Sequence, residues 1–320
     1  MVKIFSFVMV CLFVNCSSTV EKSPLIVKTE LSKELKELSG MTVKGNDIWA
    51  ITDKPKARVF KMDETGKLLQ TVNITNVEAT DVEAVTSDNN FIYLGDVGDN
   101  NGDRVERKII KVAAAGIPSG AEVEVTAETI EFTFPNEGQV ADKKQNNFDC
   151  ESLLSFKDSL YVFTKDREDK ETKLYVIPKI PGKYVARYIN SFDSKGLVTD
   201  AAVNKDNTEV ALIGYHKGHL YPFIYLFTNF KGNDFLSGEH EKINLASKNW
   251  DWQLESITYS VKNAIYFGCE GTKQVPATFY GINRNDISKL NKKKDKQSDV
   301  KKDDDEADGP ELSKKGHLKM

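Results

Sequence analysis

Cysteine and histidine are scarce in this chain, with four residues of each among 320. Cys11 and Cys16 lie within the first sixteen residues, so only Cys150 and Cys269 remain for the rest of the chain. Two cysteines are too few for a disulfide framework. Neighbouring side chains in a β-strand point to opposite faces, so Cys150 points away from Glu151, and we expect Cys150 to lie in the core. The histidines lie outside any Ser or Cys motif of known mechanics, so the sequence identifies no catalytic residue.

A strong charge of one sign is also missing, and so is helical periodicity. The formal net charge is −4, which gives no reason to expect a nucleic-acid partner. Hydrophobic residues make up 40% and charged residues 29%, a normal balance for a globular protein. Short runs of Val, Ile, Phe and Tyr alternate with clusters of Asn, Asp, Gly and Lys. This pattern predicts an all-β fold.

The first sixteen residues have the features of an export signal. Lys3 provides a positive start, and residues 4–14 form an apolar run that is too short to span a bilayer as a helix. Residues 13–18 resemble a bacterial lipobox, in which Cys16 is acylated, although Asn15 departs from the small residue usual before that cysteine. We therefore expect an exported protein of the bacterial cell envelope, attached to the membrane through a lipid anchor only. Ordinary cleavage near Ser17, giving a secreted protein, is the alternative.

The C-terminal end is dominated by mixed charge. Residues 289–315 contain nine basic and eight acidic residues and almost nothing apolar. Such a stretch cannot bury enough surface to offset the entropy lost on ordering, so residues 285–320 are predicted to be a disordered tail. The folded domain is then predicted over residues 24–284.

A repeat organises this domain. The first element of each unit begins with a polar oxygen-bearing residue and continues into an apolar strand; it starts at Ser39, Glu83, Glu151, Thr199 and Glu255. The second strand follows 9, 9, 9, 11 and 10 residues later, at Ile48, Ile92, Leu160, Val210 and Ile265. A third strand follows in every unit, and a fourth is visible in the first four units.

Four-stranded repeats of this length are typical of propeller blades. The last unit lacks a fourth strand, whereas residues 24–29 form a strand without a blade of its own. The sequence therefore predicts a five-bladed β-propeller in which the N-terminal strand completes the last blade and removes the exposed sheet edges. A count of six stays open, because the long second unit has room for a degenerate blade.

The first strand of each blade lines the central channel of a propeller. Ser39, Glu83, Glu151, Glu255 and either Thr199 or Asp200 would then face the axis as a ring. Clustered carboxylates raise one another's pKa unless a cation neutralises them, and a set of hard oxygen ligands favours Ca²⁺. The alternative interpretation is that each acid accepts hydrogen bonds within its own blade.

A second group of charged residues follows the second strands, on the face where the first strands begin. Asp53, Lys54, Lys165, Arg167 and His216 are the candidate ligand-binding residues of this rim. A cation surrounded by Lys and Arg suits an anionic small molecule, while a solvated charged rim is the alternative. An envelope protein is the other candidate partner, and we expect a monomer. If the chain is an enzyme, these residues permit metal-assisted hydrolysis.

Two resemblances to known families follow from these motifs. Residues 81–84, 93–100, 149–154 and 160–165 resemble a widespread group of uncharacterised bacterial exported propellers. This resemblance implies fold and export but no activity. The five-unit layout, with Ser39, Glu83, Glu151, Thr199 and Glu255 in order, is similar to the calcium-activated nucleotidases (apyrases).

In that family a ring of serine and glutamate residues binds one central calcium, above which nucleoside diphosphates are hydrolysed. Lys165 and Arg167 fall where the family has basic residues, and Asp53 falls where it has an acid. The other motifs of the family are not evident, and blade four departs from it. The expected function is thus an envelope propeller that binds a ligand or partner around a structural Ca²⁺. The alternative is a Ca²⁺-dependent phosphohydrolase.

Overall fold

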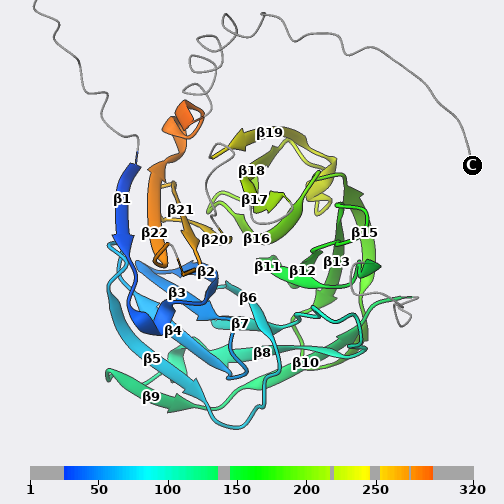
Figure 1. Ribbon diagram of the computed structural model, residues 1–320. Coiled ribbons are helices and arrows are strands. Elements are labelled where there is room, and N and C mark those ends of the chain that lie inside the picture. The colour runs from blue at the N-terminus through cyan, green and yellow to red at the C-terminus, as the bar shows by residue number, and fades with distance from the viewer. Residues whose placement is uncertain (1–24, 136–144, 217–219, 246–252, 274, 291–320) are drawn as a thin grey trace, which may run out of the picture.

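The computed structural model describes residues 25–135, 145–216, 220–245, 253–273 and 275–290. Within these ranges the chain forms five antiparallel meanders arranged as blades around a central axis (Figure 1). The protein is therefore a five-bladed β-propeller, as the repeat predicts. No helix in the described part of the chain has the length and apolar character needed to cross a membrane.

The inner strand of each blade lies beside the axis, and the strands that follow lie progressively outward. Blade one consists of β2 (Leu38–Lys44), β3 (Asp47–Thr52), β4 (Arg58–Met62), β5 (Leu68–Ile74) and β9 (Glu122–Val125). Blade two consists of β6 (Val82–Ser87), β7 (Phe91–Asp96), β8 (Arg107–Ala113), β10 (Glu128–Thr133) and β14 (Gly182–Val185). Blade three consists of β11 (Cys150–Phe156), β12 (Ser159–Thr164), β13 (Thr172–Pro178) and β15 (Arg187–Phe192). Blade four consists of β16 (Leu197–Val203), β17 (Glu209–His216), β18 (Leu220–Thr228) and β19 (Glu239–Asn244). Blade five consists of β20 (Leu254–Tyr259), β21 (Ala264–Cys269), β22 (Thr278–Asn283) and β1 (Leu25–Glu30). Among the described residues, the short 3₁₀ helices η1 (Lys33–Leu35), η2 (Ala114–Gly116) and η5 (Phe235–Ser237) lie between strands, and η6 (Arg284–Asp286) follows β22.

Blade five is completed from the other end of the chain. Strand β1 pairs antiparallel with β22, so the sheet order is β1-β22-β21-β20. The prediction that the N-terminal strand closes the ring is confirmed. Closure satisfies the backbone groups along β22, which would otherwise form an open sheet edge.

Within the described residues, the long second unit contains no sixth blade. Its additional strand β9 pairs parallel with β5 and becomes a fifth strand of blade one. Strand β14 of the next unit does the same for blade two, where it pairs parallel with β10. Each extra strand therefore passes back to the preceding blade and covers its outer edge.

The core consists of five apolar clusters, one between each pair of neighbouring blades. Strand β12 shows why the middle strands are apolar throughout. Leu160 and Val162 pack toward blade two, whereas Tyr161 and Phe163 pack toward blade four. Burial on both faces removes the polar alternation expected of a half-exposed strand. Cys150 is fully buried in the cluster between blades two and three, in agreement with the core assignment.

Packing continues beyond residue 284, where the sequence placed the end of the domain. Ile287 follows η6 and is fully buried in the cluster between blades four and five. Leu290 packs against the same cluster. Residues 285–290 thus belong to the folded body, and residues 1–24 and 291–320 lie outside the described part.

Candidate functional site

A β-bulge occurs at the same place on the inner strand of all five blades. In β2, Leu38 pairs with Thr52 and Gly40 pairs with Ile51, which leaves Ser39 as the extra residue. The same irregularity isolates the corresponding residue in the other four blades: Glu83, Glu151, Thr199 and Glu255. Bulges redirect side chains and bend the strand. The five bulged residues are the five that the repeat alignment predicts, and the register makes Thr199, not Asp200, the fourth.

A second set of equivalent positions follows immediately after the inner hairpins. The residue just before each bulge pairs with a residue of the second strand, and the next residue along the chain belongs to this second set. Its members are Asp53, Val97, Lys165, Tyr215 and Glu270. Four of them anchor this loop by donating a backbone N–H to the carbonyl two residues before the bulge, as Asp53 does to Glu37 at 2.9 Å and Lys165 to Asp149 at 2.7 Å. Four residues of each set line the cavity at the axis; the exceptions are Thr199 in the first set and Val97 in the second, which is buried in the core.

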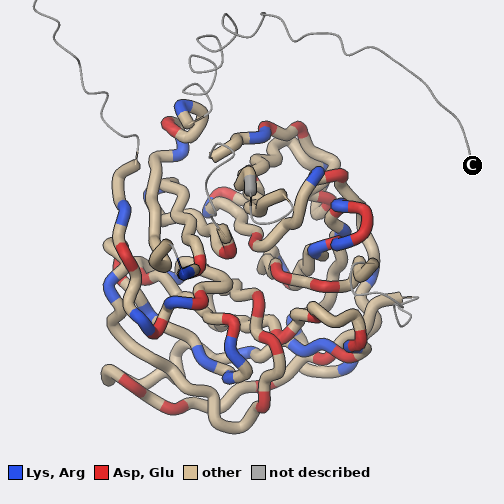
Figure 2. Tube along the Cα trace, viewed as in Figure 1, with Lys and Arg blue, Asp and Glu red and all other residues tan. Residues whose placement is uncertain are grey.

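Together the two sets enclose a cavity of about 150 Å³ at one mouth of the channel. We call this cavity the chamber; it is lined by Leu38, Ser39, Asp53, Glu83, Asn100, Glu151, Lys165, Arg167, Tyr215, Gln253, Glu255 and Glu270. Figure 2 shows acidic segments among the inner strands around the centre of the ring. Five carboxylates and two basic groups line the chamber, so its local charge is negative.

Lys165 neutralises part of this charge from inside the ring. Its ammonium donates hydrogen bonds to both carboxylate oxygens of Glu151 and lies 5.4 Å from the centre of the Tyr215 ring. Burial opposes the charged form, but Glu151, Tyr215 and Glu255 outweigh it and raise the pKa of Lys165. The Tyr215 hydroxyl donates to Glu255 at 3.1 Å. Lys165 was predicted as a rim residue, and the structure places it against a predicted metal ligand.

Thr199 and Asp200 do not contribute to the chamber. The Thr199 hydroxyl donates to the carbonyl of Leu254 at 2.6 Å, so it ties blade four to blade five. The Asp200 carboxylate is fully buried and accepts backbone N–H groups from Ala201 and Ile257, both at 2.8 Å. Asp200 therefore accepts one backbone hydrogen bond within its own blade, as the alternative interpretation expects, and one from blade five. The hydroxyl of Thr199 is engaged by backbone carbonyls, and Thr199 is absent from the chamber lining.

Three other carboxylates gather over blades one and two. Asp53, Asp81 and Glu83 each offer an oxygen, and these oxygens lie within 4.8 Å of one another. Ser39 donates a hydrogen bond to Glu83 from the neighbouring blade. Among the residues that the structure describes, no Lys or Arg forms an ion pair with any of the three. We call Asp53, Asp81 and Glu83 the acid triad.

Burial and neighbouring negative charge raise the pKa values of three carboxyl groups in and beside the chamber. Burial, together with Asp53 and Asp149, raises the pKa of Asp81 to about 7. Burial, together with Glu255 and Asp53, raises the pKa of Glu270 to about 7. Burial and then Glu151 raise the pKa of Glu83 well above its ordinary value. Carboxylic acids behave this way where counter-charge is insufficient.

The predicted rim residues are distributed unevenly. Asp53, Lys165 and Arg167 line the chamber, and Arg167 donates to Asp149 and to Asn100. Lys54 is turned outward and pairs with Glu37 at 3.1 Å. His216 lies against the rings of Phe223 and Tyr221, with centroids 5.4 and 6.1 Å away. Lys54 and His216 are absent from the chamber lining.

Sequence reasoning missed Asp81 and Tyr215. Asp81 lies two residues before Glu83, where blades one and three carry Glu37 and Asp149. The acidic residue at this position in three consecutive blades is a pattern from which the sequence could have predicted the role of Asp81. Tyr215 is aromatic where blades one, three and five carry charged residues, so a search for charge passes over it. Cys16 lies outside the described residues.

No protein-family model and no curated protein matches the chain. Solved structures do resemble it. The PQQ-bound aldose sugar dehydrogenase of Streptomyces coelicolor is 10% identical, with 80% of this chain and 97% of that chain covered and a TM-score of 0.43. The exo-β-1,3-galactanase of Phanerochaete chrysosporium with galactose is 11% identical, with 75% and 58% covered and a TM-score of 0.48. Such likenesses concern the propeller-type fold and carry no argument about function.

Proposed function

We propose that this chain is an exported propeller that binds an anionic ligand through a divalent cation, Ca²⁺, held at the chamber. The acid triad is the single observation that carries the proposal. Three carboxylates within 4.8 Å of one another form no ion pair with a Lys or Arg among the described residues. Such a group is stabilised either by taking up protons or by binding a cation.

The donor set fits Ca²⁺ better than a transition metal. The triad offers only carboxylate oxygens, and further oxygen ligands in the chamber lining are the Ser39 hydroxyl and the amides of Asn100 and Gln253. None of the described residues that line the chamber is a His or Cys. Hard oxygen ligands favour Ca²⁺ or Mg²⁺, and a carboxylate-rich site of irregular shape favours Ca²⁺. The proposed ligands are thus Asp53, Asp81 and Glu83, displaced from the axis toward blades one and two.

The ring that the sequence predicts is divided between two tasks in this proposal. Glu83 serves the cation together with Ser39, whereas Glu151 and Glu255 hold Lys165 and Tyr215. Lys165 and Arg167 then provide positive charge beside the cation, which suits a phosphate or carboxylate group. A volume of about 150 Å³ accommodates a hydrated cation or one anionic group. A larger ligand would insert only its charged end.

Export and lipidation belong to the same proposal. The apolar run before Cys16 and the lipobox-like residues 13–18 support an extracytoplasmic protein anchored through Cys16. Millimolar Ca²⁺ affinities are adequate for extracellular modules, so a site of three carboxylates is sufficient there. The proposal therefore joins an envelope location to a weak calcium site.

Calorimetric titration with Ca²⁺ tests the site. We expect wild type to bind Ca²⁺ more tightly than Mg²⁺, and Glu83→Gln to weaken Ca²⁺ binding at least about tenfold. Gly98→Ala gives an independent test, because a Cβ there would collide with the Asp81 carboxylate and lie 2.7 Å from Cγ of Glu83. Gly116→Ala is the matched control, since nothing lies within 4 Å of its Cβ position.

Inorganic phosphate is the probe for the anion. Phosphate should bind in the presence of Ca²⁺ and not in the presence of chelator. If folded wild-type protein shows no heat of binding on titration with Ca²⁺, the proposal is wrong. Calcium-dependent phosphate release from nucleoside di- and triphosphates, lost in Glu83→Gln and in Glu151→Gln, would favour the phosphohydrolase instead. The alternative has the same cation polarising a phosphoryl oxygen beside Lys165 and Arg167.

A further inference from the structure

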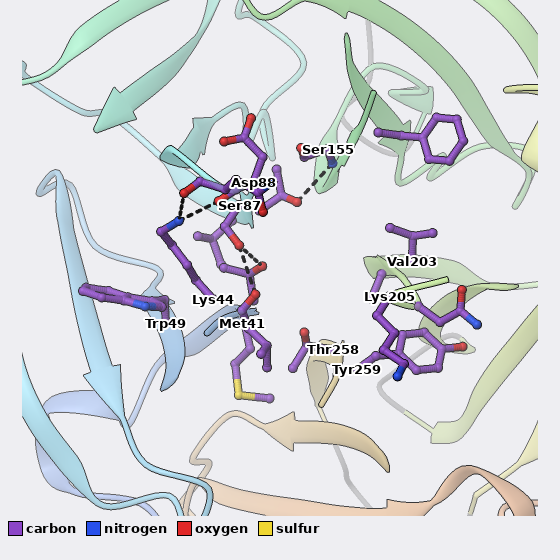
Figure 3. Close-up of a pocket in the computed structure, with 18 of the residues that line it drawn as sticks. Met41, Lys44, Trp49, Ser87, Asp88, Ser155, Val203, Lys205, Thr258 and Tyr259 are labelled. Atoms are coloured by element: carbon purple, nitrogen blue, oxygen red, sulfur yellow. Dashed lines mark hydrogen bonds between the residues drawn. The ribbon is translucent and has the colours of Figure 1, made fainter. Parts of the chain in front are cut away.

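The opposite mouth of the channel opens into a much larger cavity. It has a volume of about 910 Å³ and lies between the far ends of the inner strands, from Met41 in blade one to Val261 in blade five (Figure 3). We call this cavity the funnel. Its volume falls within the range of about 300–1,000 Å³ that is usual for small-molecule sites.

The funnel is separate from the chamber. The two cavities share no lining residue. Met41, Val85 and Ala201 form apolar lining that is almost completely buried. The fully buried carboxylate of Asp200 lies between inner strands and accepts the Ile257 N–H at 2.8 Å. A ligand in the funnel therefore makes no contact with the acid triad.

The walls combine hydroxyl groups with apolar and aromatic surface. Thr42, Thr86 and Thr258 occupy equivalent positions on three inner strands, and the Thr86 hydroxyl accepts the Ser155 N–H at 3.1 Å. Aromatic surface comes from three blades: Trp49, Phe156 and Tyr259. Figure 3 shows Lys44 and Trp49 on one side of the open centre and Lys205 and Tyr259 on the other. Such walls suit a ligand with an apolar or aromatic body.

Four lysines and two aspartates line the funnel, and both aspartates are already paired. Asp47 binds Lys61 at 2.7 Å, and Asp88 binds Lys179 at 2.9 Å. Lys44 donates to the backbone carbonyls of Asp88 and Asn89, at 2.7 and 2.5 Å.

Lys157 and Lys205 remain, and both are exposed. In the described part of the chain neither forms an ion pair. The acids next to them in sequence, Asp158 and Asp206, do not line the funnel. Two positive charges from blades three and four are thus available to a ligand.

The backbone of Lys157 gives a second, independent observation. Lys157 has φ of +51°, in the left-handed region that favours glycine and asparagine. The hairpins at the same level of blades one, four and five place Gly45, Asn207 and Asn263 in this conformation, with φ of 65°, 58° and 62°. Blade three alone among these four uses a residue that this conformation disfavours. Unfavourable backbone geometry of this kind is enriched at functional sites. Lys170 and Lys195 adopt it outside the funnel as well, so the geometry supports the proposal only together with the cavity and the unpaired charge.

We propose that the funnel binds an amphipathic anion, a small molecule that has a carboxylate, phosphate or sulfonate group and an aromatic or apolar body. Lys157 and Lys205 bind the charged group at the rim, and the aromatic and apolar wall binds the body. This site is independent of the cation site proposed above, because the two cavities lie at opposite mouths of the channel.

The anionic dye 8-anilinonaphthalene-1-sulfonate is a suitable probe, with N-phenyl-1-naphthylamine as its neutral counterpart. Fluorescence titration of wild type should show tighter binding of the anionic dye, weakened by salt. Lys157→Asn and Lys205→Gln should each weaken that binding about fivefold and leave the neutral dye unchanged. Lys33→Gln, an exposed lysine outside the funnel lining, is the matched control.

Lys157→Asn also separates function from folding. Because asparagine tolerates the left-handed conformation, this variant should unfold at the same or a higher temperature while it loses affinity for the dye. Chelator and Glu83→Gln should leave dye binding unchanged, which separates this proposal from the cation site. Equal affinity for the two dyes, or an unchanged affinity in both lysine variants, would overturn the proposal.

Discussion

Lys165 shows how a single residue can be located by sequence and still be misassigned. Its position, fourteen residues after Glu151, follows from the hairpin length. Its direction does not, because the sequence says nothing about the bulge at Glu151 that brings the two side chains together. The ammonium therefore lies against a carboxylate that was predicted to bind a metal.

Removing the Lys165 charge should destabilise the protein strongly. Lys165→Met leaves Glu151 and Glu255 buried without the ammonium that neutralises them. Breaking a buried ion pair from one side costs about 3–5 kcal/mol. Urea unfolding followed by circular dichroism should show a loss of this size.

The double variant Lys165→Met/Glu151→Gln is the control for this experiment. It removes the uncompensated charge as well as the ammonium, so it should recover a large part of the lost free energy of unfolding. If the double variant is no more stable than Lys165→Met alone, Lys165 does not stabilise the protein through its contact with Glu151.

Thr199 shows the converse limit. Its position in the repeat was ambiguous by one residue, and only the paired register of β16 and β17 resolves it. Even with the correct register, a threonine hydroxyl can donate to a nearby carbonyl, and it does so to Leu254. Four of the five predicted ring residues line the chamber, and hydrogen-bonding competition explains the fifth.

At the scale of strands, the repeat predicts inner and middle strands well, because these are long apolar runs. It does not predict β9 and β14. Both are four residues long and contain no buried residue, and each pairs parallel with a strand of the preceding blade. Short strands without a buried face have little hydrophobic signal, and parallel pairing at a distance leaves no hairpin turn to detect.

Strand β1 should be essential for a closed ring. Deletion of residues 25–30 would expose the full edge of β22 and remove the cover that Val27 gives to the cluster between blades five and one. We expect aggregation or dimerisation in light-scattering measurements and a lower unfolding temperature.

A synthetic peptide of residues 24–31 added in trans is the sharpest control. It should restore the monomer and raise the unfolding temperature, whereas a scrambled peptide of the same composition should have no effect. A deletion variant that stays monomeric and stable without peptide would show that β1 is not needed for closure.

On the scale of the whole molecule, the two mouths of one channel differ in charge. Five acidic and two basic residues line the chamber, whereas four basic and two acidic residues line the funnel. The number of blades follows from the sequence repeat. The opposite charges at the two mouths come from positions at the two ends of the same inner strands, and this pattern appears only when the strands are placed side by side.

Stability should depend on pH and Ca²⁺ together. The pKa values of Asp81 and Glu270 are raised to about 7 from ordinary values of 3.8 and 4.5. The folded state therefore binds more protons than the unfolded state between pH of about 4 and about 7, and stability falls as pH rises through this window. Allowing for solvent screening, a loss of about 1–2 kcal/mol would lower the unfolding temperature by roughly 2–8 °C.

Calorimetric scans from pH 5 to 8, with chelator or with Ca²⁺, measure this dependence. Bound Ca²⁺ replaces the protons as the counter-charge, so the fall should be smaller in its presence. An unfolding temperature that rises with pH in chelator would contradict the raised pKa values. The same slope with and without Ca²⁺ would contradict cation binding at the chamber.

The pairing of β1 with β22 also sets an order in time. Leu25 is made about 250 residues before Thr278, and at synthesis rates of about 5–20 residues per second the interval is roughly 12–50 s. Through that interval the first strand has no partner. Blades one to four can form as they emerge, but the circle is completed only after the end of blade five has left the ribosome. Until then β1 exposes unpaired backbone groups, so the chain is open to misassembly before its last blade forms.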